Sequence, residues 1–425
     1  MSPVTRGRSL VRRSAELAGG SAIGQVMLIV GTLVGARYFT PSDFGILGVY
    51  VTIVVVFGML SAGRFDAAIP IPRRDGRARD LLETASILVP MVAIASLIFM
   101  QTIAHPILSW AGAEALNEIA WMVPAGTATL GFRALFIGWC TRKGFIRTLA
   151  VGRALNGTTT GTCFIIGSFT GASLAWLVGA WLAGQAAETI VTAHRVMLDA
   201  GRESNTRGYR RRRRALRRYR RFPRILVWSH ILEQLGPHLP TTLISGFYGT
   251  EIAGIYNIIQ RIVARPAAII GSSVHVMVIS EASRRIRSGE DVLPLFNVSI
   301  KRLIRVSLVL FLPLALVGPL VIPGILGPQW AHAGLVLLAI LPGSAVDFVV
   351  VPLVPLLTLA ERALTQFGLS VARIAATIVA IAGSSVLGLG SITMLLALSL
   401  AIIAIDTVSL AACRRVVTTR SVASE

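Results

Sequence analysis

Charged residues are scarce in this sequence, and acidic residues are scarcer than basic ones. Only 14% of the 425 residues are charged and 54% are hydrophobic, whereas a soluble domain carries about 25% charged residues. This composition excludes a soluble globular protein and predicts a chain that lies mainly in a bilayer. Lysine occurs only at Lys143 and Lys301, and the remaining basic residues are arginines, a bias typical of GC-rich coding and of a bacterial source.

Cysteine is also rare, and the familiar catalytic motifs are missing. The three cysteines, Cys140, Cys163 and Cys413, lie in or beside apolar segments and have no paired spacing, so they predict neither a disulfide framework nor a metal cluster. The sequence contains no His-Glu-x-x-His, no Gly-x-x-x-x-Gly-Lys-Ser/Thr and no Gly-x-Ser-x-Gly. We therefore expect a protein that is not an enzyme, with no catalytic residue, metal or cofactor.

Long apolar segments are what the sequence has in abundance. A membrane-spanning helix needs about 20 mostly apolar residues. Six such segments lie near 15–36, 44–63, 81–104, 118–141, 148–169 and 173–194, and six more near 225–247, 252–279, 303–326, 332–360, 364–387 and 391–413. Segment 332–360 is long enough to tilt, or to kink at Pro342, Pro352 or Pro355. The sequence predicts an all-α integral membrane protein with about twelve transmembrane helices.

The basic residues indicate which loops face the cytoplasm. All but six lie at the termini or in every second loop, the exceptions being Arg37, Arg133, Arg153, Arg261, Arg265 and Arg373. Because positive side chains resist translocation, both termini and the loop 195–223 are expected in the cytoplasm. The expected location is a bacterial inner membrane, crossed many times. The outward loops, at 37–43, 105–117, 170–172, 248–251, 327–331 and 388–390, are short and nearly free of basic residues.

The loop 195–223 divides the chain into two halves that resemble each other. The expected parts are a basic N-terminus (1–14), an N-terminal lobe (15–194), the basic linker (195–223), a C-terminal lobe (224–413) and a tail (414–425). The turn at Phe39–Ile46 aligns with Tyr248–Ile255, and Pro106–Trp110 aligns with Pro323–Trp330. Six helices per half place both repeats in the same orientation, as two parallel lobes that hold substrate in a central cavity between them.

The linker contains the densest run of charge, from Arg210 to Arg221. A basic run between membrane helices lies within reach of anionic headgroups, where each charge gains about 1 kcal/mol, so anionic lipids at 210–221 are the expected partner and nucleic acid is not. Guanidinium groups also bind phosphate oxygens bidentately, so the same run is suited to recruiting a pyrophosphate headgroup.

An ordered set of short motifs resembles the motifs of a known protein family. The set comprises Gly24-Gln25, Arg37-Tyr-Phe-Thr-Pro-Ser-Asp-Phe-Gly45, Arg64-Phe-Asp-Ala-Ala-Ile-Pro-Ile-Pro72, Arg142-Lys-Gly-Phe145 with Arg153, Tyr219-Arg-Arg-Phe-Pro223, Gly254-Ile-Tyr256, and Gln260-Arg261 with Pro266. The order resembles the Wzx-type polysaccharide flippases of the multidrug/oligosaccharidyl-lipid/polysaccharide exporter superfamily. That resemblance implies two six-helix lobes around a cationic cavity and a substrate carried on polyprenyl pyrophosphate. It also makes the glycan polymerase machinery a possible partner.

Cations inside the apolar segments are the first candidates for such a site. A charge at the centre of a membrane helix costs at least about 2.5–3.5 kcal/mol, so it should face a cavity or a partner. Arg261 and Arg265 stand one turn apart on a single helical face. The candidate substrate-binding cations are Arg133, Arg261, Arg265 and Arg373, whereas Arg37 and Arg153 lie near helix ends, where an interfacial position is equally consistent.

Uncharged and acidic polar residues complete the candidates. In the seventh apolar segment, His230, Gln234 and His238 recur every four residues along one stripe, and Gly236-Pro237 is expected to bend or break that helix. Either sugar binding or a hydrogen-bond network between helices fits the stripe. Gln25, from the matching Gly-Gln pair, joins this set. The acidic candidates for ion pairing or for coupling are Glu188, Glu233, Asp347 and Asp406, with ion pairing favoured.

Three other functions remain open on the sequence alone. A membrane-embedded glycan polymerase or ligase would need a larger outward loop than any here. A major facilitator transporter would share the helix count, but the stretch Arg74–Arg79 matches that family's loop poorly. A multidrug exporter of the same superfamily would share the lobes, although the cations favour an anionic cargo.

Overall fold

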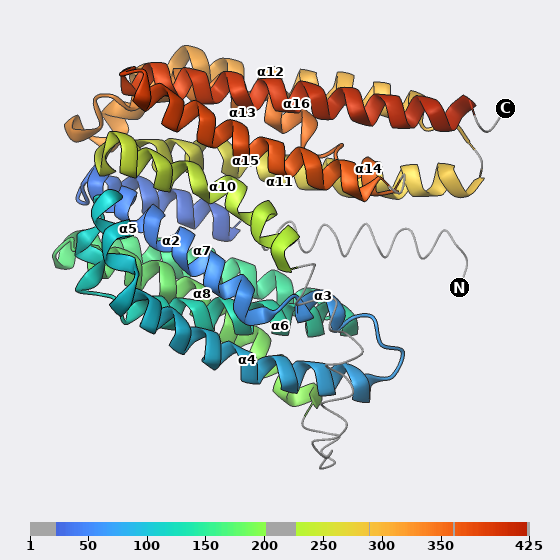
Figure 1. Cartoon of the computed structure of the whole chain (residues 1–425), viewed down its shortest axis with the longest axis horizontal. Coiled ribbons are helices and arrows are strands. Elements are labelled where there is room, and N and C mark those ends of the chain that lie inside the picture. Colours follow the sequence, from blue (N-terminus) through green and yellow to red (C-terminus); the bar gives the residue numbers. More distant parts are fainter. Residues whose placement is uncertain (1–22, 201–226, 289, 360–361, 423–425) are drawn as a thin grey trace. The chain divides into compact units, whose positions relative to one another are not determined.

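The computed structural model describes residues 23–200, 227–288, 290–359 and 362–422, and the regular elements in these ranges are all helices (Figure 1). Eleven of them have 18 or more residues, and a twelfth, Ile23–Ala36, is shorter. Each coincides with one predicted apolar segment, so the prediction of an all-α chain with a helix in each of the twelve segments is confirmed. Seven are long and apolar enough to cross a membrane on those two criteria alone. The other five are shorter or more polar, and they carry many of the candidate polar residues.

The chain forms two compact units, one ending at His238 and the other beginning at Leu239. Unit 1 contains the helix Ile23–Ala36, α2 (Pro41–Ala62), α3 (Phe65–Ala68), α4 (Asp75–Thr102), α5 (Ala104–Trp110), η1 (Glu114–Asn117), α6 (Met122–Lys143), α7 (Ile146–Thr170) and α8 (Leu174–Ala200). Unit 2 contains α11 (Thr250–Ser288), α12 (Leu293–Leu326), η4 (Pro328–Trp330), α13 (Ala333–Val350), α14 (Leu356–Leu359), α15 (Ala363–Val386) and α16 (Ser391–Val422). The division falls inside α10 (Val227–Tyr248), which contributes to both units.

Helix α2 begins in the turn Phe39–Ile46, which belongs to both the internal repeat and the family motif. Thr40 is its N-cap: the backbone N–H of Asp43 donates to Thr40 Oγ1 at 3.2 Å, and the backbone N–H of Thr40 donates to Asp43 Oδ2 at 2.9 Å. Pro41 supplies a first helical residue that needs no N–H partner. This capping box is the physical content of the motif, which therefore marks a helix start rather than a binding site.

The first helix approaches α7 so closely that only glycine fits at the crossing. A Cβ on Gly161 would lie 2.2 Å from the carbonyl oxygen of Met27, and a Cβ on Gly157 would lie 2.2 Å from that of Gly24. Small residues commonly form such contacts between membrane helices, because lipid gives no hydrophobic drive and close backbone packing supplies the attraction. The crossing holds this helix, which carries Gln25, against α7 of the same unit.

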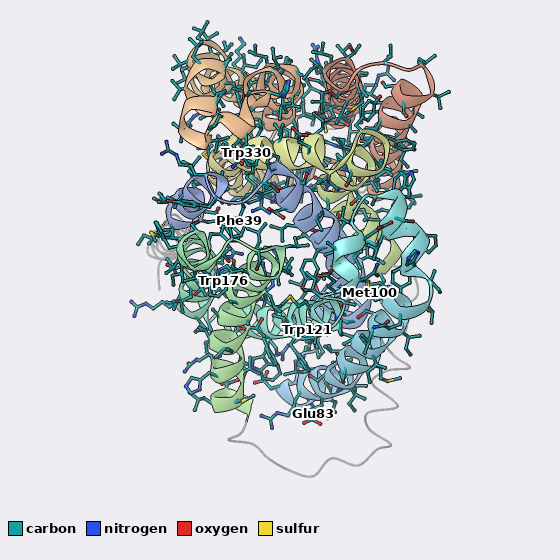
Figure 2. All side chains as sticks on the ribbon, turned by 90° about the vertical axis from the view of Figure 1, so that its left-hand side faces the viewer. Phe39, Glu83, Met100, Trp121, Trp176 and Trp330 are labelled. Carbon is teal, nitrogen blue, oxygen red and sulfur yellow. The ribbon has the colours of Figure 1, made fainter. Side chains whose placement is uncertain are left out.

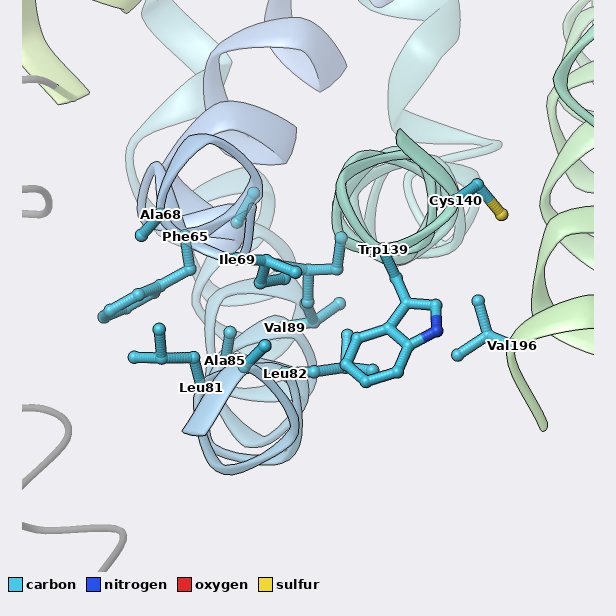
Figure 3. Packing of buried hydrophobic residues seen from close by; sticks show 13 residues of the cluster. Phe65, Ala68, Ile69, Leu81, Leu82, Ala85, Val89, Trp139, Cys140 and Val196 are labelled. Carbon is cyan, nitrogen blue, oxygen red and sulfur yellow. The ribbon is translucent and has the colours of Figure 1, made fainter. Parts of the chain in front are cut away.

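A hydrophobic cluster lies where α3, α4, α6 and α8 meet (Figure 3). Trp139 of α6 is fully buried there between Leu82 of α4 and Val196 of α8. Its indole N–H donates to Asp199 Oδ2 at 3.1 Å, so the polar edge of the ring is satisfied as well. We call this the α3 end of unit 1, and the opposite end the α5 end.

Aromatic side chains gather at the α5 end, which faces the viewer in Figure 2. Trp121 is 61% exposed, and the Trp176 indole donates to the carbonyl oxygen of Cys163 at 2.8 Å. Tyr38 and Phe169 pack with their ring centroids 5.4 Å apart. Aromatic residues with one polar edge are typical of the membrane–water interface.

Unit 2 repeats the packing of unit 1. In unit 1, α6 packs on α2, α4 and α8, and α8 on α7; in unit 2, α13 packs on α11, α12 and α16, and α16 on α15. These are the same pairs in the numbering of two six-helix halves. The predicted segment 332–360 is not one helix in the structure. Helix α13 continues through Pro342 and ends at Val350, and the helical conformation is interrupted at residues 351–355, which include Pro352 and Pro355, before α14 begins.

Candidate functional site

Three helices of unit 1 contribute to a polar cluster around Glu188. This residue of α8 is 3% exposed, and Arg133 Nη1 of α6 donates to its Oε2 at 3.2 Å. Asn156 of α7 donates to the same oxygen at 2.9 Å and to Gln185 Oε1 at 3.1 Å. A buried carboxylate with two donors on neighbouring helices is well compensated, so the cluster holds α6, α7 and α8 together.

A second cluster occupies the corresponding helices of unit 2. Arg373 of α15 donates to Asp347 Oδ1 of α13 at 2.5 Å and to Asp406 Oδ1 of α16 at 3.2 Å. Asp406 is buried, while Arg373 and Asp347 are about one third exposed. On α11 of the same unit, Gln260 donates to the hydroxyl of the buried Tyr256 at 3.1 Å.

The two clusters share one design and differ in charge. In each, the last helix of the half supplies a buried acid, Glu188 or Asp406, and a neighbouring helix supplies the arginine. Counting formal charges, the cluster of unit 1 is neutral, and that of unit 2 carries one excess negative charge. Arg133 and Arg373 are thus engaged by carboxylates, and neither presents a free cation to an anionic substrate.

Helix α10 carries the predicted stripe and continues through Gly236-Pro237, where a bend or break was expected. His230 Nδ1 lies 3.6 Å from Glu233 Oε2, and the carbonyl oxygen of His238 accepts a hydrogen bond from Thr52 Oγ1 of α2 at 3.3 Å. Gln234 is half-buried between them. Pro237 has no backbone N–H, so it cannot make the helical hydrogen bond to the carbonyl oxygen of Glu233. That oxygen remains available to accept from another donor.

The remaining candidates are placed less fully. Arg261 lies half-buried on α11 and interacts with other groups, and Gln25 is half-buried on the first helix. Arg265 belongs to α11, but its side chain lies outside the described part of the structure. The basic run 210–221 also lies outside the described residues. Within the described ranges, no group of three His, Cys, Asp or Glu residues is arranged to hold a metal ion.

Some polar residues of these clusters escaped the sequence analysis. Asn156 and Gln185 are uncharged, so a search for cations and acids passes over them. Arg64 was counted among the basic residues of an inward loop, although its Nε is buried. The signal that could have found it is local: Arg64 directly follows Gly63 at the end of an apolar run, the position of a helix C-cap.

A network of charges ties together the α3 end of unit 1. Asp75, at the start of α4, accepts from Lys143 Nζ at 2.7 Å and from Arg142 Nη2 at 2.8 Å. These hydrogen bonds, that from Lys143 first, hold the pKa of Asp75 below its ordinary value. Arg142 Nη1 also donates to the carbonyl oxygen of Pro72 at 2.6 Å, and Lys143 reaches Asp199 at 3.4 Å. The loop before α4 is thereby fixed to α6 and α8.

Comparison with known proteins agrees with this architecture. Residues 34–334 match a family model described as polysaccharide biosynthesis protein. A structure of the lipid II flippase MurJ in an inward closed conformation has a TM-score of 0.74 at 12% identity, covering 96% of this chain and 90% of the flippase. An inward-facing multidrug resistance MATE family transporter of the MOP superfamily has a TM-score of 0.69 at 15% identity, covering 94% and 96%. No curated protein sequence gives a significant match.

Proposed function

Because the chain belongs to the polysaccharide biosynthesis protein family, we propose that it moves a polyprenyl-pyrophosphate-linked oligosaccharide or polysaccharide precursor across a bacterial inner membrane by alternating access. The observation that carries the proposal is the fold. Over nine tenths of its length the chain shares the architecture of a lipid II flippase and of a multidrug resistance transporter. The proposal therefore includes no enzymatic activity.

The polar residues inside the helices support a transported polar headgroup. Arg261 and Arg265 lie one turn apart on α11, where two guanidinium groups suit a pyrophosphate dianion. His230, Gln234 and His238 of α10 offer partners for sugar hydroxyls. Arg133 and Arg373 act differently in this proposal: since each is held by carboxylates, they stabilise their own units and contribute little net positive charge.

The proposal extends to orientation and partners. Both termini and the α3 end of unit 1, with its exposed Arg73, Arg74 and Arg77, face the cytoplasm. The run 210–221 binds anionic lipids, and the glycan polymerase machinery receives the product on the other side.

Reconstitution tests the proposal directly. Purified full-length protein in liposomes should move a labelled polyprenyl-pyrophosphoryl sugar between leaflets. Arg261→Ala should abolish that movement, and Arg261→Lys should restore it only in part, because an ammonium lacks the planar fork. Arg302→Ala, an exposed arginine on α12, is the matched control and should transport normally. Full activity of Arg261→Ala at normal protein levels would remove this residue from the site.

A multidrug exporter is the second candidate, and one observation favours it. The cluster Asp347–Arg373–Asp406 carries an excess carboxylate, the feature that attracts an organic cation. The same liposomes can carry a cationic dye as competing cargo. Movement of the dye without movement of the lipid-linked sugar would establish the exporter and reject the flippase.

A further inference from the structure

Arg142 of α6 binds the loop between α3 and α4 through all three nitrogens of its guanidinium group. Its Nη1 donates to the carbonyl oxygens of Pro72 at 2.6 Å, Pro70 at 3.2 Å and Ile69 at 3.4 Å. Its Nε and Nη2 both donate to Asp75 Oδ1, at 3.0 and 2.8 Å. The side chain of Arg142 is only 9% exposed. One residue thus fixes the loop at three carbonyl groups and at the first residue of the helix that follows.

The side chains of the α3–α4 loop, residues 69–74, lie on two sides of its backbone. Ile69 is fully buried in the hydrophobic cluster of Figure 3 and anchors the loop to unit 1. Ile71 is 57% exposed, and Arg73 and Arg74 are exposed as well. Because the two prolines of the loop also restrict its backbone, it holds an isoleucine and two arginines outward in a fixed arrangement.

The acidic residue closest to these arginines in the sequence is already engaged. Asp75, which follows Arg74, accepts hydrogen bonds from two cations of α6 at 2.7 and 2.8 Å. Arg73, Arg74 and Arg77 are exposed and form no ion pair with the described part of the chain. Three positive charges therefore face outward without compensation, beside the exposed side chain of Ile71.

The position of these residues on α4 is that of a membrane surface. Exposed apolar side chains recur every three or four residues along this helix, as expected of a face turned to lipid; they are Ile87, Met91, Ile94 and Ile98. The apolar run of α4 begins at Leu81, about 6 Å along the axis from Arg77. A headgroup layer is about 5–8 Å thick. The arginines at the start of α4 therefore lie at the depth of the headgroups.

We propose that the α3–α4 loop and the first turn of α4 bind the headgroup of an anionic phospholipid. The three exposed arginines contact its phosphate group, because guanidinium groups bind phosphate oxygens bidentately. Ile71 enters the apolar edge of the bilayer, which a soluble anion does not offer. Arg142 is the positioning residue of this site, since it fixes the backbone that carries Ile71, Arg73 and Arg74. The site requires no transported cargo, so it can be tested separately from the proposed function.

Fluorescence quenching of the full-length protein in liposomes tests the site. In a variant without the three native cysteines, a bimane label is attached to a cysteine at Ile71, or at the exposed Pro70 so that Ile71 is retained. Lipids that carry a nitroxide quench this label on contact. Both leaflets have the same composition, so the orientation of the protein does not affect the result.

The expected result is a preference for the anionic lipid. Nitroxide-labelled phosphatidylglycerol should reach half-maximal quenching at a mole fraction at least about fivefold lower than nitroxide-labelled phosphatidylcholine, the factor that one basic residue at an anionic surface contributes. The preference should largely disappear at about 1 M salt, where charges are screened within about 3 Å.

Matched variants identify the groups responsible. Arg73→Gln with Arg74→Gln should abolish the preference, whereas Arg302→Gln with Arg305→Gln, which removes two exposed arginines of α12, should leave it unchanged. Arg142→Lys keeps the positive charge, but one ammonium cannot hold three carbonyl groups and a carboxylate together. It should therefore lower the preference and also lower the fluorescence anisotropy of the label, because the loop is no longer fixed.

Three results would overturn parts or all of this proposal. Equal quenching by both lipids would mean that the loop contacts the bilayer without selecting an anionic headgroup. No quenching by either lipid would place the loop in water and reject a lipid as its occupant. Unchanged preference and anisotropy in Arg142→Lys would remove the positioning role of Arg142. A loop that selects phosphatidylglycerol, in a protein that moves no lipid-linked sugar, would support the site and reject only the proposed function.

Discussion

Replacing Arg373 with methionine removes the cation that two carboxylates of unit 2 share. Methionine keeps the length and apolar stem of the side chain, so the change is mainly one of charge. Breaking a buried ion pair costs about 3–5 kcal/mol, and losing an exposed one costs about 0–1 kcal/mol. Arg373 pairs with two carboxylates that differ in burial. Asp347 is 36% exposed, so that ion pair is only partly buried, whereas Asp406 is 3% exposed and its pair is buried. The contact with Asp406 therefore dominates.

We expect a destabilisation of about 3 kcal/mol, the lower end of the buried range, because Arg373 itself is 31% exposed and water reaches part of the cluster. For a folding unit of 150–250 residues, that corresponds to a fall in Tm of roughly 6–12 °C. The assay is the thermal unfolding of the detergent-solubilised full-length protein. Arg362→Met, which removes an exposed arginine at the start of α15, is the matched control and should leave Tm unchanged.

Second-site changes show which carboxylate is responsible. Adding Asp406→Asn to Arg373→Met should recover most of the lost Tm, since a neutral amide is far cheaper to bury than an unpaired carboxylate. Adding Asp347→Asn instead should recover less, because Asp347 is more exposed. A wild-type Tm for Arg373→Met alone would refute the reasoning. If the variant with Asp406→Asn is stable but inactive, Arg373 has a role in transport beyond pairing.

Three further predictions concern other parts of the molecule. Gly161→Ala should cost about 1–3 kcal/mol by forcing the first helix away from α7, whereas Gly179→Ala, with open space around it, should be neutral in the same unfolding assay. Asp75→Asn should lower Tm at pH 7; since the pKa of Asp75 is lowered, its contribution is present above about pH 4 and is lost as pH falls through the lowered value, so the difference should vanish in acid. In intact cells, an impermeant thiol reagent should label a cysteine at Glu114 and spare one at Arg77; the reverse would reject the topology.

The sequence predicted the number of helices well and their ends less well. Apolar runs mark the part of a helix that lies in the bilayer, whereas hydrogen bonding continues beyond it. Helix α12 begins at Leu293, not near 303, because Lys301, Arg302 and Arg305 extend the helix into polar surroundings. The break at 351–355 followed from Pro352 and Pro355, but sequence alone could not choose between them and Pro342.

The pairing of polar residues could not be predicted in the same way. An apolar run locates a helix but does not show which neighbouring helix each of its side chains faces. The sequence therefore did not indicate that Arg133 pairs with Glu188 rather than with an anionic substrate. The acids were named as candidate ion-pair partners without a specific arginine for each. The repeat contained the missing information: once α6, α7 and α8 correspond to α13, α15 and α16, the acids Glu188 and Asp406 occupy matching helices.

The course of α10 across both units bears on how such a chain can have evolved. Duplication of a six-helix ancestor would place the seam in the long loop before α10, whereas packing places the division at His238. The stretch 227–238 thus descends with the second copy but is held by the first, through Thr52. The two halves are therefore not interchangeable. A chimaera that exchanges halves at the loop would have to keep the packing of residues 227–238 on the first half.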